Sequence, residues 1–235
     1  MTLSGPMKRF LKRDDIANAI RESNFVKLYE EALHHGKLMS SELTMVLYSL
    51  GLDPLVGMQI VPCGFMYNNT NTPLSIRLPN AIKKIDAAAF TRTINLHQIH
   101  INSGCEEIGE MAFGGSGLLK VGIPNTVDII EDHAFEFCKN LETVTFEPNS
   151  KLTYIASSAF KKCDKLQEIY LPDSVEALGD ECFARTRIRL LKLPKNIRVF
   201  GEGCIPNRPD ITIRCHKHTF GDMWANKNNF NVEYI

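Results

Sequence analysis

The amino-acid sequence predicts an α/β solenoid, in which short coils stack so that a parallel β-sheet runs along one face. The first observation is a recurring Ala-Phe dipeptide, found at Ala89-Phe90, Ala112-Phe113, Ala134-Phe135 and Ala159-Phe160. From Tyr67 to Cys204 the aromatic position and its weaker equivalents are spaced by 23, 23, 22, 25, 23 and 21 residues. The second is an apolar-x-apolar segment in each interval, usually closed by proline, as in Ile169-Tyr170-Leu171-Pro172. Self-similarity at this period is typical of stacked repeats.

Length and composition fit an ordered globular protein. The 235 residues are 44% hydrophobic and 23% charged, values that exclude disorder of the whole chain. Lys and Arg number 27 and so do Asp and Glu, which gives a net charge of zero. A dedicated nucleic-acid binder normally carries a basic excess, so we expect no nucleic-acid partner. No segment approaches the ~18 consecutive apolar residues of a membrane span, so none is expected.

Residues 8–52 have the pattern of helices and precede the repeats. Asp14 or Asp15 can begin a helix that extends to about Arg21. A second apolar stripe ends at Gly36, and a third helix can begin at Ser40 or Ser41. We expect residues 1–58 to form a helical cap over the first coil, because an open solenoid end needs covering. The alternative is a small helical module with its own partner.

The repeats are expected over residues 59–215. In each unit a short strand is ended by proline, and a turn with a second apolar pair leads to the Ala-Phe dipeptide, on a short helical turn or an irregular segment. No unit can bury its apolar side alone, so the units must stack. Three residues after the aromatic position stands a small side chain that we expect inside the stack: Thr70, Thr93, Ser116, Cys138, Cys163 or Thr186.

The C-terminal residues 216–235 are predicted to cap the other end of the array. Ile211-Thr212-Ile213 reads as the last repeat strand. A short helix is expected from Phe220 to Lys227, with Phe220, Met223 and Trp224 turned inward. Residues 230–235 alternate like a closing strand.

The repeat resembles the BspA-like leucine-rich repeat. Residues 169–183 follow the consensus of apolar-x-apolar-Pro, two later apolar positions and a small residue before Phe, and Phe160 to Leu166 supplies the remainder with Cys163. The resemblance covers about residues 60–235. It implies a leucine-rich repeat array of about six to seven units of ~23 residues. It also implies a protein-recognition scaffold and not an enzyme, of a kind found on bacterial surfaces, in some protozoa and in phage genomes.

No pattern of catalytic or metal-ligating residues stands out. Phosphate-loop, nucleophile-elbow, zinc-protease and dinucleotide-binding motifs are missing from the sequence. The cluster Cys215-His216-Lys217-His218 lacks the paired spacing of a zinc site. We therefore expect no catalytic residues, no metal and no cofactor. Seven cysteines, an odd count, without a recognisable export signal favour reduced thiols and a cytoplasmic location. A virion or cell-surface location is the alternative.

A partner is expected to contact the outward residues of the strands. These residues differ from coil to coil, whereas the inward ones stay apolar. A solvated face without a partner would show the same pattern. The pairs run from Ser75 and Arg77 in the first strand to Asp210 and Thr212 in the last. Tyr and Arg are typical of binding hot spots, and the candidate contacts are Arg77, His100, Glu168, Tyr170, Leu190 and Lys192.

The sequence therefore predicts a non-enzymatic protein–protein interaction module with one rigid, preformed surface. A phage-encoded intracellular effector or inhibitor of a host protein is the leading hypothesis for its role. A structural subunit of a virion or of an adhesin-like cell-surface assembly is the alternative. The oligomeric state is not predicted.

Overall fold

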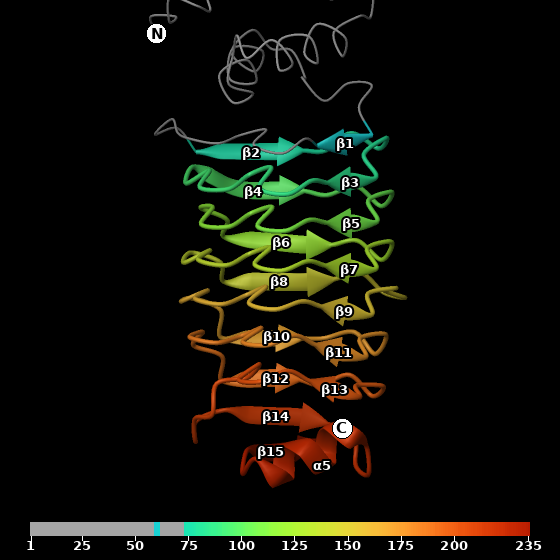
Figure 1. The fold of residues 1–235 in the computed structure, drawn as a ribbon, viewed down its shortest axis with the longest axis vertical. Coiled ribbons are helices and arrows are strands. Elements are labelled where there is room, and N and C mark those ends of the chain that lie inside the picture. Colours follow the sequence, from blue (N-terminus) through green and yellow to red (C-terminus); the bar gives the residue numbers. More distant parts are fainter. Residues whose placement is uncertain (1–58, 62–72) are drawn as a thin grey trace, which may run out of the picture.

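The structure is a computed structural model that describes residues 59–61 and 73–235. These residues form a stack of parallel coils (Figure 1). Each coil consists of a longer strand, a two-residue strand and a segment that carries the Ala-Phe dipeptide. The helices predicted over residues 8–52, the cap predicted over residues 1–58 and the first repeat at Met66-Tyr67 lie outside the described residues.

The predicted parallel strands are present, and their outward side is the first face of the array. They pair as two four-stranded sheets, β2-β4-β6-β8 and β10-β12-β14-β15. The break between β8 and β10 coincides with the 25-residue interval, whose extra residues lie between β8 and the next short strand. The strands are β2 (Leu74–Arg77), β4 (Leu96–His100), β6 (Lys120–Ile123), β8 (Thr143–Phe146), β10 (Glu168–Tyr170), β12 (Leu190–Lys192), β14 (Thr212–Cys215) and β15 (Asn231–Tyr234).

A second parallel sheet lies where the sequence predicted only turns. The second apolar pair of each coil forms a two-residue strand, and these strands build one seven-stranded sheet. The physical reason is the stacking itself, which brings the same pair of each coil into register, as in Ile85 opposite Ile108. The strands are β1 (Ile60–Val61), β3 (Lys84–Ile85), β5 (Glu107–Ile108), β7 (Ile129–Ile130), β9 (Tyr154–Ile155), β11 (Ala177–Leu178) and β13 (Val199–Phe200).

The Ala-Phe segment is the irregular alternative of the two predicted, and it carries its own ladder of hydrogen bonds. The amide of Phe90 donates to the carbonyl of Ala112 at 2.6 Å, and the amide of Phe113 donates to Ala134 at 2.8 Å. Residues on both sides of each Ala-Phe adopt left-handed backbone angles, which disfavour side chains other than glycine. These residues are Ala88, Arg92, Met111, Gly115, His133, Phe137, Ser158, Lys162, Glu181 and Arg185.

One Phe ring per coil forms a continuous stack through the core. The rings of Phe90, Phe113, Phe135, Phe160 and Phe183 are fully buried. Neighbouring ring centroids are 5.1 to 5.5 Å apart, and the ring planes are within 8° of parallel. This spacing is close to that between adjacent strands of a sheet, so backbone and side chains stack with one period.

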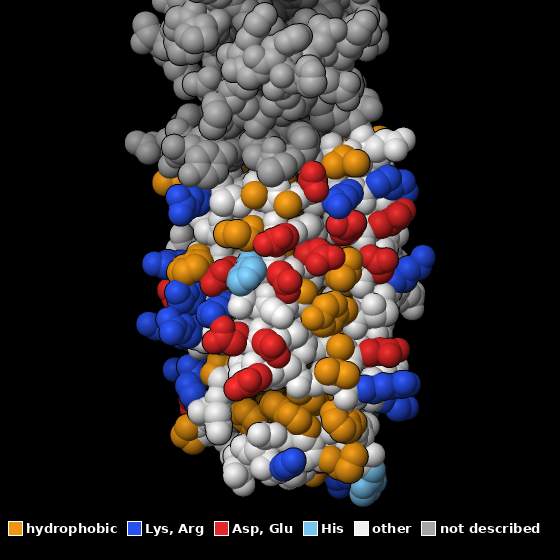
Figure 2. All heavy atoms as spheres, in the orientation of Figure 1, with side chains coloured by type: hydrophobic (Ala, Val, Ile, Leu, Met, Phe, Trp, Pro, Cys, Tyr) orange, Lys and Arg blue, Asp and Glu red, His pale blue; other side chains and the backbone are white. Residues whose placement is uncertain are grey.

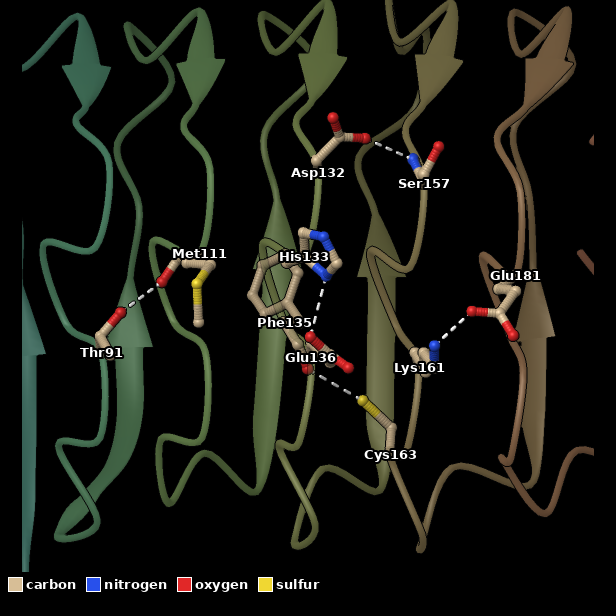
Figure 3. Close-up of polar contacts among 10 residues, drawn as sticks. All are labelled: Thr91, Met111, Asp132, His133, Phe135, Glu136, Ser157, Lys161, Cys163 and Glu181. Carbon is tan, nitrogen blue, oxygen red and sulfur yellow. Dashed lines mark hydrogen bonds and ion pairs between the residues drawn. The ribbon is translucent and has the colours of Figure 1, made fainter.

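The small residue after each Phe closes the core beside the ring. The thiol of Cys138 donates to the carbonyl of Phe113 at 3.0 Å, and that of Cys163 donates to Phe135 at 3.2 Å (Figure 3). The hydroxyl of Thr186 donates to Phe183 at 2.8 Å. The core position predicted for these residues is confirmed where the structure describes them. Other contacts between neighbouring coils include the hydrogen bond from Thr91 to the carbonyl of Met111.

The C-terminal end contains the predicted helix and closing strand. Helix α5 (Phe220–Lys227) begins after Thr219, whose hydroxyl accepts from the amide of Asp222. Trp224 faces inward, as predicted, and its ring centroid is 4.0 Å from that of Phe200. The inward orientation predicted for Phe220 and Met223 is wrong, since 46% and 61% of their surfaces are exposed.

The helix turns Gly221, Asp222 and Ala225 toward the array instead. Gly221 lies so close to the array that a Cβ there would be 3.1 Å from Ile197. Asp222 accepts hydrogen bonds from the amide of His218 and from Tyr234. A helical wheel that ranks residues by hydropathy therefore selects the wrong inner face.

We expect Gly117→Ala to destabilise the protein and Gly122→Ala to be tolerated. A Cβ on the buried Gly117 would overlap the backbone carbonyl of Ile94, whereas one on the exposed Gly122 would lie 3.5 Å from the Thr145 hydroxyl. The predicted loss for Gly117→Ala is about 3 kcal/mol. For Gly122→Ala the change stays within about 0.5 kcal/mol. Urea unfolding followed by circular dichroism measures both, and similar midpoints would contradict the close packing at Gly117.

Candidate functional site

The outward residues of the longer strands form a continuous surface, here called the strand face. Cross-strand register arranges them in two rows along the array. One row runs from Ser75 through Gln98, Lys120, Thr143, Glu168, Leu190 and Thr212 to Asn231. The other contains Arg77, His100, Gly122, Thr145, Tyr170, Lys192, Arg214 and Glu233.

The six predicted contact residues fall into two separate groups on this face. Arg77 on β2 lies opposite His100 on β4, and both are exposed. Strands β6 and β8 separate this pair from the other four residues. Their outward residues are small or short apart from Lys120: Gly122, Thr143 and Thr145. The structure therefore does not bring all six residues into one site.

The second group is compact. On β10 and β12, Glu168 lies opposite Leu190 and Tyr170 lies opposite Lys192. The Tyr170 hydroxyl donates to the Glu168 carboxylate at 3.2 Å, while 44% of the Tyr170 surface stays exposed. Leu190 and Lys192 are half-buried, so Leu190 is less exposed than its sequence position predicted. These four side chains combine an aromatic ring, an apolar side chain and both signs of charge.

A hollow of about 530 Å³ adjoins this group. Tyr170 and Lys192 line one side of it, and residues 146–150 line another. Lys192 also forms an ion pair with Asp173 in its wall, at 3.7 Å. Sequence reasoning did not include residues 146–150 in the site, although the 25-residue interval that contains them was a signal of an irregular coil.

Arg214 is a residue of the strand face that sequence reasoning missed. The predicted outward pair of the last repeat strand was Asp210 and Thr212, but the pair in register with Leu190 and Lys192 is Thr212 and Arg214. Asp210 precedes the strand and pairs with Arg208 at 3.3 Å. The register shifts because Ile213, not Ile211, lies opposite Leu191. Arg214 donates to Glu233 at 2.8 Å, and this hydrogen bond raises its pKa.

The described cysteines are core residues with weakly acidic thiols. Burial raises the pKa of Cys105 to about 11 and the pKa values of Cys138 and Cys204 to about 12. Burial also raises the pKa values of Cys163, Cys182 and Cys215. A thiol must ionise to act as a nucleophile or as a metal ligand. These side chains therefore contribute packing, and residues 215–218 are no exception for the thiol.

The described part of the chain was searched for metal-binding groups and membrane spans. Residues 59–61 and 73–235 contain no cluster of three or more His, Cys, Asp or Glu side chains suited to holding a metal ion. Within the same residues, no helix has both the length and the apolar character needed to span a membrane.

The coil geometry defines the class of protein as a parallel-strand leucine-rich repeat solenoid. Residues 63–189 match the BspA type leucine rich repeat region, in six copies. This match covers more than half of the chain, so the chain belongs to the BspA-type leucine-rich repeat family. Repeats of this family are generally non-enzymatic scaffolds, of the kind typical of protein-binding modules. No curated protein sequence matches the chain.

Solved structures support the fold. The pneumococcal vaccine antigen PcpA is 22% identical, with a TM-score of 0.56 over 67% of this chain and 50% of that one. The T. pallidum leucine rich repeat protein is 21% identical, with a TM-score of 0.44 over 60% of this chain and 58% of that one. The chain thus spans about half the length of these proteins. At this identity the likeness concerns the fold alone.

We expect the described cysteines to resist alkylation in the folded protein. Their raised pKa values keep the thiols protonated at about pH 8.5, where an ordinary cysteine is half ionised, and their burial blocks the reagent. Iodoacetamide labelling mapped by peptide mass spectrometry, with and without denaturant, measures the difference. Labelling of Cys138 at the same rate in both conditions would contradict its place in the core.

Proposed function

We propose that this protein is a non-enzymatic recognition module whose strand face binds another protein. The observation that carries the proposal is the group formed by Glu168, Tyr170, Leu190 and Lys192 beside the hollow of about 530 Å³. An exposed Tyr next to a concave surface has the chemistry of a binding hot spot. The strands beneath it are fixed by the core on their inward side, so little conformational entropy is lost when a partner binds.

Arg77 and His100 form a second contact region in this proposal. They lie on the same face, separated from Tyr170 by β6 and β8. Parallel strands are about 4.8 Å apart, which places the two regions roughly 15 to 20 Å from each other. A protein surface of ordinary interface size covers both, because standard interfaces bury about 800 Å² per partner. A small molecule does not reach from one to the other.

Within this proposal the partner is met inside a cell, and the protein acts as an effector or inhibitor of a host protein, for instance one encoded by a phage. The buried free thiols of the described coils are compatible with a reducing compartment. A structural subunit of a virion or cell-surface assembly is the competing role. Cell fractionation separates the two, because stable co-purification with virion or envelope proteins would contradict the intracellular role.

The test of the strand face is affinity capture with the full chain from its native host, followed by binding measurements on the captured partner. We expect Tyr170→Ala to weaken binding at least tenfold, which corresponds to about 1.4 kcal/mol. Arg77→Glu and Lys192→Glu should weaken it in the same direction.

The matched control for the charge reversals is Lys195→Glu. Lys195 is exposed in the turn between β12 and β13, away from the outward strand residues. Unchanged affinity for Tyr170→Ala, or an equal loss for Lys195→Glu, would overturn the assignment of the strand face. Circular dichroism of each variant separates loss of binding from loss of folding.

A further inference from the structure

A second surface of the array differs in composition from the strand face. The segments between each ladder Phe and the following longer strand stack along one long edge, which is here called the loop flank. Figure 2 shows Lys and Arg side chains gathered along the left edge of the molecule. The basic residues of these segments are Arg92, Lys139, Lys161, Lys162, Lys165, Arg185, Arg187, Arg189 and Arg208.

One coil of the loop flank presents three unpaired guanidinium groups. Arg185, Arg187 and Arg189 are exposed and alternate with the buried residues Thr186 and Ile188. The alternation points the three side chains outward from one extended segment. None of the three forms a salt bridge with a residue of the described ranges 59–61 and 73–235.

Other bases of the loop flank already have partners. Lys161 pairs with Glu181 (Figure 3), and Lys165 pairs with Glu142 at 3.0 Å. The guanidinium of Arg208 donates to the carbonyls of Thr186 and Ile188 and therefore helps to hold the segment that carries the three arginines. Arg185, Arg187 and Arg189 are thus a distinct feature and not part of a general network of ion pairs.

A notch lies beside these bases on the same flank. Residues 114–117, Gly-Gly-Ser-Gly, contribute no large side chain, and a hollow of about 440 Å³ is left between the neighbouring coils. Its walls include Ile94, Met111 and Phe137, which are 54%, 37% and 39% exposed. We call this hollow the glycine notch.

Positive charge surrounds the apolar walls of the glycine notch. Lys139 lines it directly. The ammonium of Lys162 lies 3.9 Å above the centre of the Phe137 ring, a cation–π contact. The notch therefore suits an apolar side chain that is accompanied by negative charge.

The neighbouring face limits what kind of anion can bind. The Ala-Phe side of the array carries exposed acidic residues in successive coils, and Figure 2 shows red side chains beside the basic edge. They include Glu110, Asp132, Asp180, Glu181 and Glu202. A long nucleic acid would pass close to these carboxylates and be repelled. A short acidic peptide segment can stay on the loop flank.

We propose that the loop flank is a second docking surface, which binds a short acidic segment of a partner protein. One apolar side chain of that segment occupies the glycine notch, and its carboxylates pair with Arg185, Arg187 and Arg189. Arginine pairs with carboxylates through two parallel hydrogen bonds, which gives geometric specificity. Two to three coils separate the notch from the arginines, roughly 10 to 15 Å. About three to five extended residues span that distance.

This inference rests on the proposed protein-recognition function only for the nature of the partner. It concerns a different surface, so the two can fail separately. Loss of peptide binding at the loop flank leaves capture through Tyr170 unaffected, and failure of the strand face leaves the peptide measurement unaffected.

The probe is a fluorescein-labelled peptide with one Phe, a four-residue Gly/Ser spacer and three consecutive Glu residues. We expect saturable binding to the full chain in a fluorescence anisotropy titration, with a dissociation constant below about 1 mM. The binding should weaken as salt is raised, because exposed charges are screened. A peptide with Gln in place of Glu tests the carboxylates, and one with Ala in place of Phe tests the notch. Each should bind at least threefold more weakly.

Two variants locate the site on the protein. Arg187→Glu/Arg189→Glu should weaken binding of the acidic peptide at least tenfold, and Ile94→Glu, which places a carboxylate at the notch, at least threefold. The matched control is Lys195→Glu/Arg198→Glu, two exposed residues between β12 and β13 that lie outside the loop flank. It carries the same change in net charge and should bind within twofold of the unchanged protein.

Three results would each overturn the proposal: no saturable binding of the peptide, an equal loss for the control variant, or equal binding of the Gln peptide. Tighter binding of an oligothymidine of the same length than of the acidic peptide would also overturn it, in favour of a nucleic-acid surface. Circular dichroism of the variants excludes unfolding as the cause of a loss.

Discussion

Each coil of this protein can bury its apolar side only against the coils before and after it, and the remaining features of the structure follow from that axial stacking. The Phe rings, the amides of the Ala-Phe segments and the two kinds of strand all stack with the same period. A backbone or side chain that does not fit this spacing would separate two coils. Gly117 illustrates the constraint, because its neighbour in the stack is the backbone carbonyl of Ile94 and leaves no room for a Cβ.

The constraint applies to the inside of the array and leaves the outside free to vary, so the surfaces with chemical character occur where the repeat is irregular. The hollow beside Tyr170 is lined by residues 146–150, within the one interval of 25 residues. The glycine notch lies in the coil that has Gly-Gly-Ser-Gly where its neighbours have larger side chains. Both hollows come from a change in one coil against a background of regular neighbours, which hold their walls in place.

The repeat period was sufficient to predict the longer strands, the buried Phe positions and the small residues beside them, because each depends on residue types that recur at fixed spacing. It was not sufficient for the two-residue strands, since a pair of residues has no periodicity of its own and becomes a strand only through its neighbours. Register at the C-terminal end was also missed. The last interval is 21 residues long and has no proline after the strand, so Ile211 was aligned where Ile213 belongs and Arg214 was left out. Helix α5 was predicted with its bounds but with the wrong inner face, because backbone proximity at Gly221 decides its orientation.

Stacking also explains how a chain of zero net charge acquires charged surfaces. Each repeat position becomes a column along the array, so acids at one position and bases at another separate onto neighbouring faces. Like charges on adjacent strands repel when no opposite charge lies nearby. On the strand face the repulsion is offset within the protein, as in the pairs of Arg214 with Glu233 and of Lys192 with Asp173. On the loop flank, Arg185, Arg187 and Arg189 have no such partner among the described residues. An acidic segment that binds there removes a repulsion that the folded protein keeps, and this difference gives the loop flank an electrostatic source of affinity that the paired charges of the strand face lack.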